Sequence, residues 1–236
     1  MNFVVFVIFW VLSPIGCAST QSHGKERANP TLAKQALHEK LRQNYPAYAR
    51  LQAYFTLKGK VDGQEIYYEG ILDSKQKSFS VLLKDSIFKS PLFSIKIDEE
   101  KVIQIDYLRD KKETIPFEEY RWVVLFGRLF PFRFFYPILK GYLPNEIFLE
   151  DTVYEETKEG KIRFLFKTPY FDARAVIEEG ILRNLFYKNE INQEVVAITF
   201  EGTSMAQGRY FPQKIYISRP KTLDYVQLNF SRVVVE

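Results

Sequence analysis

The sequence has little of the side-chain chemistry that enzymes use. It contains one cysteine, Cys17, and two histidines, His23 and His38, and all three precede the first expected strand. A single cysteine excludes a disulfide framework and a thiolate metal site. The main body has no histidine that could serve as a general base, a zinc ligand or a triad member. We therefore expect no catalytic residue, no metal site and no cofactor.

The sequence also lacks a dominant sign of charge. Its 33 basic and 29 acidic residues give a formal net charge of +4 and are scattered along the 236 residues. This balance argues against a nucleic-acid-binding protein and leaves open a local basic patch for anionic lipid. Hydrophobic residues make up 46% of the chain and aromatic residues 16%. That content suffices for the core of one large domain, which we expect to be monomeric.

The chain begins with an apolar run. Residues 2–15 (NFVVFVIFWVLSPI) have the length of a secretory signal core and are short for a transmembrane helix. Gly16 and Cys17 follow directly. A small residue before a lone cysteine resembles the lipobox of bacterial lipoproteins. The resemblance implies a signal peptide over 1–16 and lipidation of Cys17; an ordinary cleaved signal and an uncleaved anchor are the alternatives.

Residues 17–30 carry no periodic hydrophobicity, so we expect a lipidated, flexible tether that leads to a single domain over 31–236. Ala18, rather than Asp, follows the cysteine. By analogy with lipoprotein sorting, this favours the periplasmic face of the outer membrane. A helix is expected from about Pro30 until Pro46 closes it, with His38 as a solvated residue on it.

Most of the domain alternates apolar and polar residues with a period of two. Five strands are expected first, at Leu51–Leu57, Ile66–Leu72, Phe79–Leu83, Phe93–Ile97 and Val102–Leu108. Seven more are expected later, at Ile147–Tyr154, Ile162–Phe166, Ala173–Ile177, Leu182–Tyr187, Val195–Phe200, Phe211–Ile217 and Leu223–Val235. The fold class is α+β, mostly β: about eleven antiparallel strands in one curved half-barrel sheet.

The segment 117–144 interrupts the alternation with a helical period and many aromatic residues. Gly127, Pro131, Pro137 and Gly141 divide it into short pieces. We expect a pair of short apolar helices that act as a lid and enclose an apolar cavity under the sheet. The alternative is that these aromatic side chains fill a solid core.

The order of these features resembles the LolA/LolB-like lipoprotein localisation superfamily, and within it LolB most. Ser90-Pro91-Leu92 is similar to a Pro-Leu-Gly loop of LolB, and Phe126-Gly127 through Ile138–Pro144 to the glycine and proline layout of its helical segment. The end of the chain, Tyr216–Val234, resembles the closing hairpin of that family. The resemblance implies a protein that accepts acylated lipoproteins from a periplasmic LolA-like carrier and inserts them into the outer membrane.

Two sets of candidate residues follow. The connector Lys84–Leu92 sets apolar residues between lysines, so we expect Ile87, Phe88 or Leu92 to enter lipid. Candidates that line an acyl cavity are Phe55, Tyr68, Phe79, Val81, Trp122, Phe126, Phe130, Phe135, Ile138, Phe164 and Phe186. The partners would be the acyl chains of lipoproteins or lipids. A lipid carrier, an envelope sensor and a structural lipoprotein are the competing functions on this fold.

Overall fold

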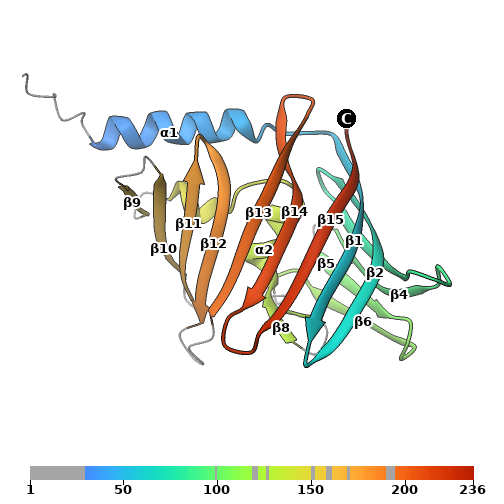
Figure 1. Ribbon diagram of the computed structural model, residues 1–236. Helices are drawn as coiled ribbons and strands as arrows, with labels where there is room; N and C mark the ends of the chain where they lie inside the picture. Colours follow the sequence, from blue (N-terminus) through green and yellow to red (C-terminus); the bar gives the residue numbers. More distant parts are fainter. Residues whose placement is uncertain are drawn as a thin grey trace, which may run out of the picture.

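The computed structural model describes residues 30–98, 100–118, 122–125, 128–149, 152–157, 161–168, 171–189 and 195–236. One open antiparallel sheet of thirteen strands dominates it (Figure 1). The strands of this sheet are β1 (Arg50–Val61), β2 (Gln64–Lys75), β3 (Phe79–Asp85), β4 (Pro91–Ile97), β5 (Lys101–Asp106), β6 (Lys111–Pro116), β9 (Val153–Glu156), β10 (Ile162–Thr168), β11 (Phe171–Glu178), β12 (Ile181–Asn189), β13 (Val195–Ala206), β14 (Arg209–Arg219) and β15 (Asp224–Val235).

The strand order places the first and last strands side by side in the middle of the sheet. It runs β6-β5-β4-β3-β2-β1-β15-β14-β13-β12-β11-β10-β9. Strands β1 to β6 therefore form one meander and β9 to β15 another, and among the described strands the β1–β15 ladder pairs the two arms. A bulge at Ser231 interrupts this ladder, because Tyr54 pairs with Arg232 and Phe55 with Phe230. Bulges increase the local bend of a sheet.

The mostly β, single-sheet prediction agrees with the structure, but the strand count was too low. The missed strand β6 and the short strand β9 form the two edges of the sheet. Their sequences, KKETIP and VYEE, are rich in charged residues, so neither shows a clear apolar alternation. Charged side chains protect an edge from pairing with other chains. The expected strand Ile147–Tyr154 is instead a 3-10 turn, η1 (Asn145–Phe148), followed by β9.

The helical interpretation of 117–144 was wrong in its first half. Strands β7 (Trp122–Leu125) and β8 (Arg128–Pro131) form a separate two-stranded hairpin, in which Leu125 pairs with Arg128. Two residues lie between these partners, the length of a tight hairpin connection. The helix α2 (Phe132–Leu139) follows, with Pro137 inside it. The expected lid is thus one hairpin, one helix and η1 rather than a pair of helices.

The sheet has an apolar inner face, and the strands alternate as the sequence predicted. Inner-face side chains from every strand between β1 and β5 and between β10 and β15 belong to one hydrophobic cluster. Helix α2 lies on this inner side (Figure 1), where the Tyr136 ring meets Phe79 edge-on with centroids 5.1 Å apart. The outer face carries polar side chains and scattered aromatic rings, among them Tyr216 stacked on Tyr225.

The first helix, α1 (Pro30–Asn44), lies across the ends of the strands of the second arm (Figure 1). Lys34 Nζ donates to the carbonyl of Thr152 at 2.8 Å, and Asn44 Nδ2 to that of Gly180 at 2.7 Å. Tyr45 Oη accepts from the Leu182 amide at 3.0 Å. In the described ranges, no helix is both long and apolar enough to cross a bilayer.

His38 corrects a further expectation, since it is buried rather than solvated. Its ring stacks on Phe164 at 6.0 Å and meets Phe148 edge-on at 5.2 Å. The reason is the helical period: His38 shares with Leu41 and Tyr45 the face that α1 turns to the sheet. Burial, followed by the charges of Lys34 and Arg42, lowers the pKa of His38 below its usual value.

Candidate functional site

The inner face holds most of the described candidates for acyl contact. Phe55, Phe79, Ile138 and Phe164 are buried in the main cluster. Tyr68 and Val81 are packed against the same cluster but keep part of their surface exposed. The register explains this grouping, because Tyr68 pairs with the inner residue Leu57 and Val81 with the inner residue Leu72. These strands therefore present one continuous apolar surface.

Phe186 is the exception, because the structure places it on the outer face. It pairs with Arg174, whose guanidinium carbon lies 4.5 Å from the centroid of the Phe186 ring. Its neighbours Leu185 and Tyr187 are buried on the inner face. An irregularity in the β11–β12 ladder at Val176/Ile177 changes the alternation, so Leu182 and Leu185 are both buried. Counting by twos from Leu182 therefore assigns Phe186 to the wrong face.

The remaining candidates lie outside what the structure describes. Cys17 and Phe126 are outside the described residues. The structure describes the backbone of Trp122, Phe130 and Phe135 but not their side chains. The expectation that these residues line an acyl cavity, or that Cys17 is lipidated, stays a prediction.

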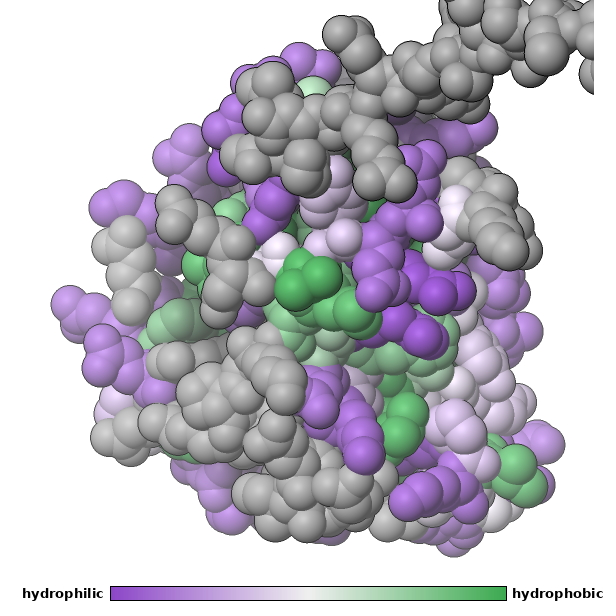
Figure 2. Space-filling view, turned by 90° about the vertical axis from the view of Figure 1, so that its left-hand side faces the viewer, coloured by the Kyte–Doolittle hydropathy of each residue, from purple (hydrophilic) through white to green (hydrophobic). Residues whose placement is uncertain are grey.

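Apolar surface also reaches solvent at the β9 side of the molecule. Figure 2 looks onto that side and shows apolar atoms in its middle, with polar side chains around them. Near this edge, Leu149 is 47% exposed and Val153 is 56% exposed. Both flank the short segment that joins η1 to the edge strand β9.

The β3–β4 hairpin, at the other side, ends in an exposed apolar tip. Ile87 is 77% exposed and Phe88 82% exposed. The Asp85 carboxylate accepts hydrogen bonds from the amides of both residues, at 2.8 and 2.7 Å. Lys89 adopts a φ of 57°, an uncommon conformation that costs of the order of 1 kcal/mol for a non-glycine residue. The backbone thus fixes the position of these two side chains.

Leu92 differs from the other two candidates of this tip. It lies at the irregular start of β4, where Leu83 pairs with Phe93 and Lys84 with Pro91. Its side chain is half-buried, and its carbonyl accepts the Tyr107 amide at 3.0 Å. Among the expected residues, Ile87 and Phe88 are therefore the ones that the fold presents to solvent.

A second exposed tip, at the β5–β6 hairpin, was not identified from the sequence. Leu108 is 75% exposed and Tyr107 42% exposed. The expected strand was drawn through Leu108, whereas β5 ends at Asp106 and the chain turns there. The signal that could have shown this is the aspartate itself, since Asp caps a turn through its side chain.

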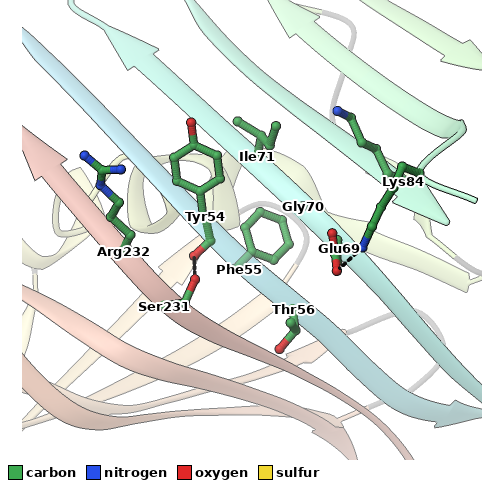
Figure 3. A pocket seen from close by; sticks show the side chains of 10 residues that line it. Tyr54, Phe55, Thr56, Glu69, Gly70, Ile71, Lys84, Ser231 and Arg232 are labelled. Atoms are coloured by element: carbon green, nitrogen blue, oxygen red, sulfur yellow. Dashed lines mark hydrogen bonds and ion pairs between the residues drawn. The ribbon is translucent and has the colours of Figure 1, made fainter. Parts of the chain in front are cut away.

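A groove of about 510 Å³ on the outer face begins beside the first tip (Figure 3). Tyr54 and Ile71 form its apolar wall, and the cations Arg232 and Lys84 stand on opposite sides of it. Lys89 also lines the groove and pairs with Glu69 at 2.6 Å. The groove can offer an anion two positive charges next to an aromatic ring.

Another cation, Arg209, is buried at the far end of the sheet. Arg209 is 1% exposed, and its guanidinium carbon lies 4.5 and 4.6 Å from the ring centroids of Tyr48 and Tyr142. It donates hydrogen bonds to the carbonyls of Pro46 and Gly141, and its burial lowers its pKa. These bonds tie the loop after α1 to the end of α2 and to the β13–β14 hairpin. Arg209 therefore has a structural role, at the end of the sheet opposite the exposed tips.

The described residues contain no group of three or more His, Cys, Asp or Glu side chains that could hold a metal ion. What the geometry offers is surface: an apolar inner face, two apolar tips and a cationic groove. Such an arrangement can bury acyl chains and meet a lipid surface.

No protein-family model matches the chain, and no curated protein matches it either. Solved structures do match. A Vibrio parahaemolyticus domain provisionally named as an outer membrane lipoprotein-sorting protein has a TM-score of 0.64 at 9% identity, over 85% of this chain and 91% of its own. A LolA superfamily protein from Nitrosomonas europaea has a TM-score of 0.57 at 12% identity, over 86% and 93%.

A DUF1329 family protein from Desulfovibrio piger has a TM-score of 0.60 at 11% identity, over 88% of this chain and 94% of its own. At identities this low, the likeness shows the fold. The chain has the mostly β, open antiparallel sheet of the LolA-like fold.

Proposed function

We propose that this LolA-fold chain is an envelope lipoprotein that holds acyl chains on its inner face and delivers them to a membrane through its exposed tips. The observation that carries the proposal is the occurrence, in one sheet, of a continuous apolar inner face and the solvent-exposed pair Ile87 and Phe88 at its end. The first feature suits cargo, and the second suits a membrane. Burial replaces catalysis as the working principle.

The inner face has the chemistry that an acyl chain requires. Removing apolar surface from water contributes about 25 cal/mol per Å². Partly exposed inner-face residues such as Tyr68 and Val81 leave apolar surface available for such a contact. Pro137 within α2 removes one helical hydrogen bond, which suits a segment that has to move when cargo enters.

Delivery requires contact with the receiving membrane. Exposed apolar side chains are costly in water, and here the Asp85 hydrogen bonds and the φ of Lys89 hold two of them outward. We infer a LolB-like role in which acylated lipoproteins arrive from a LolA-like carrier and enter the outer membrane. Lipidation of Cys17 would keep the chain at that membrane.

The test uses residues 24–236 and separates holding from delivery. Displacement of a fluorescent fatty acid measures holding, and transfer of a labelled lipopeptide to liposomes measures delivery. Changing Ile87→Glu together with Phe88→Glu should leave displacement unchanged and abolish transfer. Leu223→Glu is the matched control, since Leu223 is 81% exposed in the β14–β15 turn, and it should transfer normally.

Two results would contradict the proposal. If the parent protein binds no fluorescent fatty acid, the inner face is a filled core and the chain is a structural lipoprotein. If the double change binds the probe and still transfers cargo at the parent rate, the Ile87 and Phe88 tip is not the surface that delivers, and the proposed route of delivery is wrong.

A further inference from the structure

The β5–β6 tip is built like the β3–β4 tip. In the first tip, the Asp85 carboxylate accepts hydrogen bonds from the amides of Ile87 and Phe88. In the second tip, the Asp106 carboxylate accepts hydrogen bonds from the amides of Leu108 and Arg109, at 3.0 and 3.1 Å. Each tip also contains a non-glycine residue with positive φ, Lys89 at 57° and Asp110 at 50°. Both turns are therefore fixed by an aspartate and hold their apolar residues outward.

The two tips lie side by side at one end of the sheet. Their strands are neighbours, and Phe93 of β4 pairs with Asp106 of β5 directly before the second turn. The Tyr107 amide donates to the Leu92 carbonyl at 3.0 Å, and the hydroxyl oxygens of Tyr107 and Ser94 lie 3.5 Å apart. Figure 1 shows both hairpins projecting at the side of the sheet away from β9. One flat surface can touch both tips.

Cations lie on one side of this pair of tips. Lys84 and Arg232 line the groove of Figure 3, and within the described part of the chain neither has a carboxylate partner. The exposed Arg109 adds a basic side chain at the second tip, where its Nε lies 3.7 Å from Oδ2 of Asp106. The carboxylates of Asp85 and Asp106 are engaged by the backbone of their own turns. Exposed apolar side chains with basic side chains next to them are typical of a surface that enters an anionic lipid interface.

We propose that the two tips form one membrane-docking face, in which Leu108 and Tyr107 enter the lipid interface beside Ile87 and Phe88, with Lys84 and Arg232 at the level of the lipid phosphates. This inference deepens the proposed function and rests on its membrane step. Two points of contact restrict the rotation of the sheet on the membrane more than a single tip does.

The test uses the full chain with Cys17→Ser, so that one introduced cysteine is unique. Leu108→Cys, Phe88→Cys, Leu223→Cys and Met205→Cys each receive the environment-sensitive dye NBD. The probe membrane is a vesicle of phosphatidylethanolamine and phosphatidylglycerol, with lipids that carry a quencher in the acyl chain. Met205 is 60% exposed near the opposite end of the sheet and serves, with Leu223, as the control.

We expect the dye at positions 108 and 88 to shift to the blue and to be quenched, while the dye at 223 and 205 keeps its emission in water. If the dye at position 88 enters lipid while the dye at position 108 stays in water, only one tip docks, and the proposal is overturned. Dye in lipid at all four positions also overturns it, because the contact would lack a defined face.

A second variant provides a measurement without a dye. Leu108→Glu should weaken binding to the same vesicles about tenfold, the effect of losing one buried leucine side chain. Unchanged vesicle binding contradicts the second contact. Fatty-acid displacement without vesicles is recorded for every variant, so a failure of acyl holding is distinguished from a failure of docking.

Discussion

The ring of Phe55 lies directly over Gly70, its cross-strand partner in β2. A Cβ added to Gly70 would overlap the Phe55 ring, well inside the 3.0 Å that real Cβ contacts keep. The aromatic ring thus occupies the space that a side chain at position 70 would take. This contact lies on the inner face, where Phe55 also meets Phe230 at a centroid distance of 5.6 Å.

Gly70→Ala should therefore lower the free energy of unfolding by about 1–3 kcal/mol, the usual cost of overpacking a core. Combining it with Phe55→Leu should recover part of this loss, because the smaller side chain leaves room for the new methyl group. Urea unfolding of the four proteins of this double-mutant cycle measures the coupling.

Gly59 supplies the control for that cycle. A Cβ at Gly59 would meet the backbone oxygen of Tyr225, which no side-chain change removes. Gly59→Ala should be destabilising with or without Phe55→Leu. Equal recovery in the two glycine variants would show that Phe55 is not the cause.

Val81 tests which face of the sheet holds the acyl chain. Val81→Glu places a carboxylate on the partly exposed inner face, and losing a valine-sized contact of about 1.5 kcal/mol corresponds to roughly tenfold weaker binding. Phe186→Glu, on the outer face opposite Arg174, should leave acyl binding unchanged. Fatty-acid displacement measures both, and equal effects at the two positions would contradict an inner-face site.

Lys84 and Arg232 should govern how strongly the chain binds anionic vesicles. A basic side chain near an anionic membrane contributes about 1 kcal/mol, so Lys84→Gln with Arg232→Gln should weaken binding roughly thirtyfold. Flotation with phosphatidylglycerol vesicles at several salt concentrations measures the effect, which salt should reduce. Lys96→Gln, an exposed lysine elsewhere on β4, is the control and should bind as the parent does.

The lowered pKa of His38 predicts that the free energy of unfolding depends on pH. Because its folded pKa lies below its unfolded pKa, the unfolded chain binds more protons, and stability is lost as the pH falls through the unfolded pKa toward the folded one. Replacing His38→Leu should flatten this part of the profile between about pH 7 and pH 5. Thermal unfolding across that range compares the two proteins, and parallel profiles would exclude His38 as the cause.

Strand positions could be predicted because one face of the sheet is buried. Residues such as Leu51, Ala53 and Phe55 alternate with polar neighbours, and the structure buries all three. Apolar–polar alternation disappears where both faces of a strand are apolar. Trp122–Leu125 is apolar at every position, so its period could not separate a strand from a helix.

The candidate site shows the same limits at single residues. Ile87 and Phe88 could be found, because apolar residues between lysines in a connector are unusual. Leu108 was missed, since the expected strand was drawn through it although β5 ends at Asp106, the aspartate that marks the turn. The burial of Arg209 depends on contacts with Pro46 and Gly141, which are far away in the chain, and no local pattern encodes those contacts.

The ladder between β1 and β15 joins two meanders, and its partners are the first and last strands of the sheet. Until the final strand has been synthesised, both meanders expose an unpaired edge at what will become the centre of the molecule. Contacts across such a sequence separation form late and slowly. A nascent chain of this kind is vulnerable to aggregation for most of its synthesis, and it depends on being kept apart from other chains until its two halves close.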